Sequence, residues 1–262
     1  MEGCRAHSSA APSPIGAPPH TVVRVKFMHT VTVICLANSR KPPSGRCIAG
    51  KRFDGTKTAE WIRPVSNRAS HEVSEEERRY ETGSKAQLLD IILIPLLGHN
   101  PKGHQVENYT LDDQFYWGKK GRATWEQVMA AADPYDAKFW NNSQSTYHGN
   151  NDKVAEVDVA KIGSSLKLIL VSDLIICVNS ESGFDGNPGR RRVRGRFTLK
   201  GISYLLSVTD PDVEEYYLQQ GNGDYNLGEA ALCISLVEVW NGFSFRVVAS
   251  VITKSRCENC DG

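Results

Sequence analysis

The side chains in this sequence that are best suited to chemistry are arginines. Residues 190–200 (RRRVRGRFTLK) hold six basic residues and no acidic one. If this run forms a β-strand, Arg192, Arg194 and Arg196 share one face at a spacing of about 6.6 Å, and Phe197 points to the other face. A guanidinium presents a planar fork of donors that suits phosphate, so the row predicts contacts with successive phosphates of a single nucleic-acid strand. Two other interpretations stay open: a solvated face that protects a sheet edge, and a contact for a protein partner.

A second basic cluster lies nearer the start of the chain, among small and polar residues. Its members are Arg40, Lys41, Arg46, Lys51 and Arg63. Trp61 lies among them, and basic groups with an interleaved aromatic ring suit tracking of a nucleic-acid backbone with stacking of its bases. The alternative is an ordinary polar hairpin with Trp61 in the core, where tryptophan is more often found.

Metal and cofactor chemistry has little support in the sequence. Cys257 and Cys260 form a CxxC pair, but a structural zinc site takes four ligands, usually from two such pairs, and there is no second pair. We therefore expect no metal and no cofactor, and we expect this segment to be a tail.

Catalytic motifs are also missing. The sequence contains no GxSxG, no Walker loop, no HExxH and no GxGxxG at a helix start. Cys35 and Cys47 lie in apolar runs, where a free cysteine usually packs as a small core residue, although His71 or His148 beside either one would make it a nucleophile. Asp90, in another apolar run, is either a satisfied structural carboxylate or a metal ligand of a nuclease. We expect no catalytic residue.

Charge and composition exclude several classes of protein. The 262 residues include 31 Lys+Arg and 30 Asp+Glu, a net charge of +1, so the chain is neither a histone-like polycation nor an acidic tail protein. No apolar stretch reaches the roughly 20 residues of a membrane helix, and residues 1–20 lack the basic start and apolar core of a secretory signal, so we expect no membrane partner. The seven cysteines are odd in number and irregular in spacing, which indicates a reducing, cytoplasmic location.

The elements that must position these side chains are mostly short strands. We predict a disordered tail over 1–20, a first barrel over 21–121, a helical linker over 122–160, a second barrel over 161–254 and a flexible tail over 255–262. In the second module the strand and helix signals follow the order β-β-β-α-β-β, which matches a five-stranded Greek-key barrel. The predicted fold class is therefore mainly β with minor α.

Two helix starts carry specific signals. Thr124 and Gln127 fit a capping box, in which a hydroxyl and a side-chain amide satisfy the free backbone N–H groups of the first turn. Asp210 before Pro211 fits a second start, and Gly221 fits the end of that helix.

Glycine and proline mark the turns. Residues 38–45 (NSRKPPSG) are predicted to be a loop. Residues 200–201 (KG) are predicted to join two strands. Asn241-Gly242 between two β-rich runs predicts a type I′ hairpin, because both residues tolerate positive φ.

Together these residues resemble a known family, the dual OB-containing domain proteins of bacteria. The resemblance rests on residues 35–41 (CLANSRK), 45–51 (GRCIAGK), 61–66 (WIRPVS), 196–197 (RF), 206–211 (LSVTDP), 232–236 (LCISL), 241–242 (NG) and 247–249 (VVA). It covers roughly residues 31–252 and implies two consecutive OB-like barrels with a nucleic-acid-binding role. It implies no catalytic residues, and the tail 1–20 and the CxxC pair lie outside it.

Three functions follow from the sequence, in order of support. The first is a non-catalytic protein that binds single-stranded RNA or DNA through the basic residues of both barrels. The second is an adaptor for a protein partner. The third is a metal-dependent nuclease that uses Asp90. Because OB barrels bind oligonucleotides, oligosaccharides and proteins alike, the fold does not choose among them.

Overall fold

The computed structural model describes residues 29–134, 140, 144–182 and 189–259. The predicted disordered tail over 1–20 and the second cysteine of the CxxC pair lie outside these residues. No helix in the described part of the chain is long and apolar enough to cross a membrane.

The first half of the chain forms a closed barrel of five strands with a sixth strand added. The strands are β1 (His29–Lys41), β2 (Gly45–Phe53), β3 (Thr58–Val65), β4 (Asp90–His99), β5 (Asn108–Leu111) and β6 (Gly118–Arg122). The order is β1-β2-β3-β5-β4-β6, and an additional β1–β4 pairing closes the barrel. The β3–β5 pair is parallel, and the other pairs are antiparallel.

The second half repeats this topology. Its strands are β7 (Lys153–Ala155), β8 (Leu166–Glu181), β9 (Arg190–Leu199), β10 (Ile202–Val208), β11 (Gly223–Leu236) and β12 (Phe243–Ile252). Strands β8 to β12 pair as β1 to β5 do, including the parallel pair β10–β12, and β7 adds to β12. The prediction of two consecutive five-stranded barrels is confirmed, and each barrel carries one further strand that the sequence did not reveal.

Four short helices accompany the barrels. They are α1 (Trp125–Ala130), α2 (Glu156–Val159), α3 (Pro211–Gln220) and α4 (Lys254–Glu258). The predicted capping box of α1 is present, since the Thr124 side chain accepts from Gln127 N and the Gln127 side chain accepts from Thr124 N. The Asp210 side chain caps α3 by accepting from Val213 N, and Gly221 ends it at φ 107°.

Two of the predicted turns are present, whereas a third predicted loop is partly a strand. Asn241 and Gly242 adopt φ 49° and 77°, and residues 200–201 adopt φ 51° and 77°, so both predicted turns are confirmed. The predicted loop over 38–45 is wrong in its first half, because β1 continues to Lys41 and pairs there with Gly45 of β2. Proline stops the ladder only after Lys41, because it cannot donate a backbone hydrogen bond.

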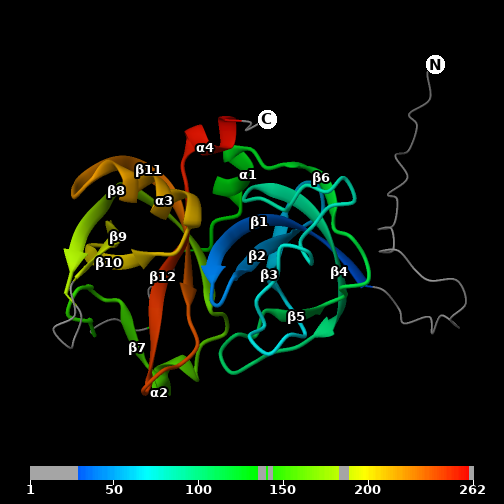
Figure 1. The fold of residues 1–262 in the computed structure, drawn as a ribbon, viewed down its shortest axis with the longest axis horizontal. Coiled ribbons are helices and arrows are strands. Elements are labelled where there is room, and N and C mark those ends of the chain that lie inside the picture. Colours follow the sequence, from blue (N-terminus) through cyan, green and yellow to red (C-terminus); the bar gives the residue numbers. More distant parts are fainter. Residues whose placement is uncertain (1–28, 135–139, 141–143, 183–188, 260–262) are drawn as a thin grey trace, which may run out of the picture.

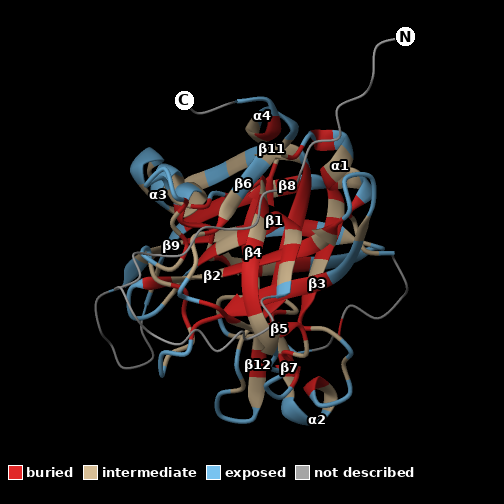
Figure 2. Ribbon diagram, turned by 90° about the vertical axis from the view of Figure 1, so that its right-hand side faces the viewer, coloured by how far each residue is buried: buried red, intermediate tan, exposed pale blue. Residues whose placement is uncertain are grey.

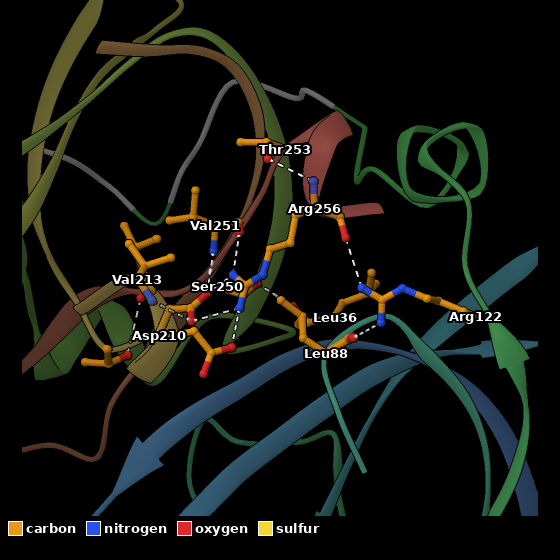
Figure 3. Close-up of polar contacts among 12 residues, drawn as sticks. Leu36, Leu88, Arg122, Asp210, Val213, Ser250, Val251, Thr253 and Arg256 are labelled. Carbon is orange, nitrogen blue, oxygen red and sulfur yellow. Dashed lines mark hydrogen bonds and ion pairs between the residues drawn. The ribbon is translucent and has the colours of Figure 1, made fainter. Parts of the chain in front are cut away.

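The predicted flexible tail from 255 is also wrong over the described residues. Lys254–Glu258 forms α4, in which Cys257 is buried. The Arg256 guanidinium reaches Asp210 Oδ2 and Asp212 Oδ2, each at 2.6 Å, and this pairing fixes the helix against the second barrel (Figure 3).

The two barrels lie side by side (Figure 1). They share buried side chains. One core cluster joins apolar residues of both barrels, among them Leu36 and Trp61 from the first and Leu168 and Ile252 from the second. Strands β1 and β4 are buried over most of their length, and the exposed surface is concentrated on loops and on helices such as α2 and α3 (Figure 2). The barrels are therefore one packed unit.

Buried polar groups cross the same interface. Asp133, just after α1, accepts from Lys51 Nζ at 2.5 Å and from Trp61 Nε1 at 3.2 Å, both in the first barrel. It also accepts from Leu168 N of β8 at 2.7 Å, and Lys51 Nζ donates in addition to Ala131 O at 2.8 Å. The Asp133 carboxylate thus forms hydrogen bonds with groups of β2, β3 and β8.

A second set of buried polar side chains also joins the two barrels, and its central member is Arg63. Arg63 Nη2 lies 2.9 Å from Glu107 Oε1 and donates to Ser165 Oγ at 2.9 Å. Ser165 also donates from its hydroxyl and its backbone N–H to Glu107. Leu236 N donates to Ser165 O at 2.9 Å, which carries the connection into β11.

A third set of contacts lies beside α4 (Figure 3). Ser250 Oγ of β12 donates to Leu36 O of β1 at 2.5 Å. Arg122 of β6 donates to Leu88 O at 3.3 Å and to Arg256 O at 2.9 Å. Hydrogen bonds at three separate places therefore fix the orientation of the barrels.

We predict that Asp133→Ala destabilises the whole chain by about 3–5 kcal/mol, because it leaves the buried Lys51 ammonium without its carboxylate. Urea unfolding followed by circular dichroism measures this loss. The matched control is Glu60→Ala, which breaks the exposed Arg52–Glu60 pair at 2.5 Å and should cost less than about 1 kcal/mol. Equal losses for the two variants would contradict the prediction.

Candidate nucleic-acid interface

The arginine row lies on β9, the second strand of the second barrel. Val193 and Phe197 are buried, and the Phe197 ring stacks on Tyr204 with centroids 5.2 Å apart. Arg192 and Arg194 are partly exposed and Arg196 is exposed. The predicted alternation of faces is confirmed, and the row faces outward.

Acidic residues of neighbouring strands neutralise part of this row. Arg194 donates to both carboxylate oxygens of Glu181 on β8, at 2.5 and 2.9 Å, and both side chains are largely buried. Arg196 donates to Asp224 of β11 at 2.7 Å, and this hydrogen bond raises the pKa of Arg196. The sequence did not show this, because both acids lie on other strands.

The side chain of Arg192 has no ion-pair or hydrogen-bond partner among the described residues. Its pKa is lowered, chiefly by burial and then by the positive charge of Arg190. Arg190 is exposed at the start of the strand. The next residue, Arg191, instead donates to Leu218 O of α3 at 2.6 Å and to Asn222 Oδ1 at 2.9 Å. Arg190 and Arg192 are therefore the cations of β9 that can bind an anion without first breaking a contact with another described side chain.

In the first barrel, three predicted residues lie at the turn between β1 and β2. Arg40 and Arg46 are partners in the β1–β2 register. The exposed guanidinium of Arg40 lies 3.1 Å from Glu214 of α3, and Arg40 N donates to Thr209 O, so this turn touches the second barrel. Lys41 and Arg46 are partly exposed, and no described acid pairs with either.

The other two predicted residues of this barrel do not belong to the surface. The side chains of Lys51 and Arg63 are 8 % and 3 % exposed, and each is paired with a carboxylate at the barrel interface. They were expected to face solvent, and this is wrong because the second barrel covers that side of β2 and β3. Trp61 is buried beside Lys51, so the core alternative holds for its ring.

A small cleft lies beside Lys41. Its lining residues are Lys41, Val65, His71, Asn100, Pro101, Lys102, Gln105, Asn108 and Glu238. It lies at the β1–β2 turn and the β4–β5 loop of the first barrel, and Glu238 comes from the β11–β12 loop of the second. In OB barrels the strand 2–3 face and the loops between strands 1–2 and 4–5 hold the ligand. The sequence analysis did not identify the β4–β5 loop as part of a candidate site, although the length of the loop could have indicated it.

Asp90 is a structural group. It is fully buried and accepts from Tyr80 Oη at 2.7 Å and from Gln87 N at 3.0 Å. Lys119 Nζ lies 2.8 Å from its other oxygen. Over the described residues no group of three or more His, Cys, Asp or Glu side chains could hold a metal ion.

The two histidines considered as partners of the cysteines contact backbone carbonyl groups instead. Cys35 is fully buried, and burial, with the nearby charge of Asp90, raises the pKa of its thiol to about 12. His71 Nδ1 lies 3.2 Å from Ser66 O, and His148 lies in the other half of the chain, where its Nε2 is 3.2 Å from Ser182 O.

We predict that iodoacetamide at pH 8 leaves Cys35 and Cys233 unmodified in the folded protein. Both thiols are buried with raised pKa values, so below those values they stay protonated, and the thiolate is the reactive form. Peptide mapping by mass spectrometry reads the modification, with the partly exposed Cys47 as internal control. Labelling of Cys35 as fast as that of Cys47 would contradict the burial.

The comparisons with known proteins bear on the fold. Neither the curated proteins nor the solved structures give a match. Among protein families, the dual OB-containing domain matches residues 31–251. This span begins in β1 and ends in β12, so it includes both closed barrels. The resemblance seen in the sequence is thus confirmed, and the chain belongs to the dual OB-containing domain family.

Proposed function

We propose that the protein binds single-stranded nucleic acid, RNA or DNA, and does not cleave it. The observation that carries the proposal is the outward row of arginines on β9, the second strand of an OB barrel. That strand belongs to the face with which OB barrels hold oligonucleotides. A row of guanidinium groups at about 6.6 Å spacing suits the phosphates of an extended strand.

How strongly each arginine of β9 contributes to binding depends on the ion pair that it forms. The Arg196 and Asp224 side chains are 44 % and 49 % exposed, and an exposed pair of this kind contributes at most about 1 kcal/mol, so phosphate can replace Asp224 at small cost. The Arg194–Glu181 pair is bidentate and largely buried, so it resists exchange. Arg192 and Arg196 are therefore the main contacts of this row.

The first barrel adds a second set of cations. Arg40, Lys41 and Arg46 lie at the β1–β2 turn, and Lys102 lies on the β4–β5 loop. Arg40 is bonded through Glu214 to α3, the helix that also holds Arg191 of β9. Basic residues of both barrels therefore contact the same helix.

The two alternatives have less support. For an adaptor, the specific observation is that Val157 and Trp240 are 68 % and 67 % exposed on elements joined by the Glu156 N–Gly242 O hydrogen bond. Two side chains fall well short of the roughly 800 Å² per partner of a standard interface. The nuclease alternative has less support because the Asp90 carboxylate is fully buried, with one oxygen accepting from Tyr80 and the other paired with Lys119.

We also infer the cytoplasmic location. The five described cysteines are all free thiols, and four of them are buried. Free thiols persist in a reducing compartment such as the cytosol.

We predict that Arg192→Ala with Arg196→Ala weakens binding to single strands and lowers the slope of log K against log salt by about 1.4, about 0.7 for each lost phosphate contact with a single strand. Fluorescence anisotropy with labelled single-stranded RNA, single-stranded DNA and duplex, at several salt concentrations, measures both quantities. The matched control is Lys254→Ala, which removes an exposed cation of α4 that pairs with Glu258. An unchanged affinity and slope in the double variant would overturn the proposal for β9.

We predict the opposite effect for Glu181→Gln. The change keeps the size of the side chain and removes the charge that neutralises Arg194, so affinity for single strands rises and the salt slope steepens by about 0.7. The same titration measures it, and Glu60→Gln on an exposed pair of the first barrel serves as control. A weaker affinity in Glu181→Gln would mean that the pair positions Arg194 for binding.

A further inference from the structure

An exposed tryptophan lies on the loop between β11 and β12. Trp240 is 67 % exposed, whereas the four other tryptophans, Trp61, Trp117, Trp125 and Trp140, are at most 7 % exposed. Among the residues that the structure describes, no ring or cation stacks on the Trp240 side chain. A single exposed ring is common on protein surfaces, so its position in the fold decides whether it binds a ligand.

The backbone of the loop holds this ring in one place. Trp240 N donates to Phe243 O at 2.8 Å, and Phe243 N donates to Trp240 O at 3.1 Å, around the Asn241-Gly242 turn. Just before the turn, Val239 packs on the core of the second barrel. The loop is therefore ordered before any ligand arrives, and little conformational entropy is lost when a ligand covers the ring.

The loop occupies a position at which OB barrels hold ligands. It joins the fourth and fifth strands of the second barrel, and the loop between these strands is one of the two binding loops of the fold. Glu238 on this loop lies 3.7 Å from Lys102, which is on the corresponding loop of the first barrel. Lys102 and Lys41 line the same cleft. The Trp240 ring is thus carried on a loop that contacts the basic residues of the first barrel.

A lysine lies next to the residue that pairs with Trp240. Trp240 and Phe243 are directly opposite each other in an antiparallel bridge, and the side chains of such a pair project to the same face. Lys153 Nζ lies over the Phe243 ring, 3.9 Å from its centroid. Lys153 is partly exposed, and no acid among the described residues forms an ion pair with it. This face therefore combines an indole and a cation, the two kinds of group with which single-strand binding sites hold base and phosphate.

We propose that Trp240 stacks on one base of a bound single strand and that Lys153 binds a phosphate next to that base. The proposal rests on the proposed function and supplies the stacking ring that the buried Trp61 cannot provide. Every base has a π face, so this contact adds affinity without sequence preference.

The surroundings of the ring favour a base over a protein surface. In the same loop the exposed residues are Glu238, Asn241 and Gly242, which offer no further apolar side chain. On α2, which lies beside the loop and is bonded to Gly242 O, Val157 is the exposed apolar residue (Figure 1). One flat ring beside a cation matches a single nucleotide, whereas a protein interface needs a wider apolar patch.

The first test measures the affinity of the full chain and its variants for labelled oligothymidylate over a range of salt concentrations. Trp240→Ala should weaken binding by roughly 5- to 150-fold, the range for the loss of one stacked base. The salt slope should stay unchanged, because no phosphate contact is lost. Trp240→Tyr keeps a ring and should lose much less affinity than Trp240→Leu, which is apolar but cannot stack.

Two further variants separate the groups around the ring. Lys153→Ala should lower the salt slope by about 0.7, as expected for one phosphate contact with a single strand. The matched control is Val157→Ala, which removes an exposed apolar side chain beside the same loop and should bind as wild type does. A loss in Val157→Ala as large as that in Trp240→Ala would assign the effect to general apolar contact and overturn stacking.

Indole fluorescence gives a second readout that affinity alone does not. Because the other four tryptophans are buried, acrylamide quenching of the folded protein reports mainly on Trp240. Saturating oligothymidylate should protect the indole from acrylamide. An abasic deoxyribose-phosphate oligomer of the same length carries the same charge and should not protect it.

Three results would contradict these expectations. Unchanged affinity in Trp240→Ala, or acrylamide quenching that oligothymidylate does not reduce, would overturn stacking while salt-dependent binding by wild type upheld the proposed function. An unchanged salt slope in Lys153→Ala would overturn the phosphate contact. No binding of any single strand would overturn both proposals and favour a protein partner for this face.

Discussion

The carboxylate of Asp133 is the contact on which the arrangement of this protein depends. It is bonded to Lys51 and Trp61 of the first barrel and to the backbone of β8 in the second. Each of these groups is largely buried, so none can exchange its partner for water without a desolvation cost. The carboxylate lies at the end of α1, and the capping box at Thr124 fixes where that helix begins.

The surface chemistry follows from this fixed orientation. Because the barrels cannot rotate, the β1–β2 turn of the first barrel lies against α3 of the second, and Arg40 pairs with Glu214 there. The same orientation brings Glu238 to the cleft beside Lys41. On β9, acids from β8 and β11 reduce the charge of the arginine row without removing it. A chain with a net charge of +1 can in this way keep a local basic face.

Sequence reasoning succeeded where a pattern is local and failed where two distant segments meet. The alternation in 190–200, the capping box at Thr124 and the Asn241-Gly242 turn each depend on neighbours in the chain, and each is found in the structure. The burial of Lys51 and Arg63 depends on which side of the first barrel the second one covers. A basic residue in a polar hairpin looks the same in the sequence whether solvent or a second barrel lies above it.

The candidate site also combines features that the local sequence predicts with features that depend on distant segments. Arg192, Arg194 and Arg196 could be placed on one face from spacing alone, but Glu181 and Asp224 lie 13 and 28 residues away from their partners. The cleft beside Lys41 could not be recognised, because its lining comes from segments that lie far apart in the sequence.

The packed junction between the barrels also has a consequence for the proposed binding of a nucleic-acid strand. When two binding modules are joined by a flexible linker, the effective concentration of the second site falls gradually as the linker grows. Here the junction is a packed core with buried hydrogen bonds, so the span between the two basic surfaces is a constant of the fold. A polymer shorter than this span would gain no affinity from the basic surface of the second barrel. A polymer long enough to contact both surfaces would gain the full binding free energy of the second surface in one step.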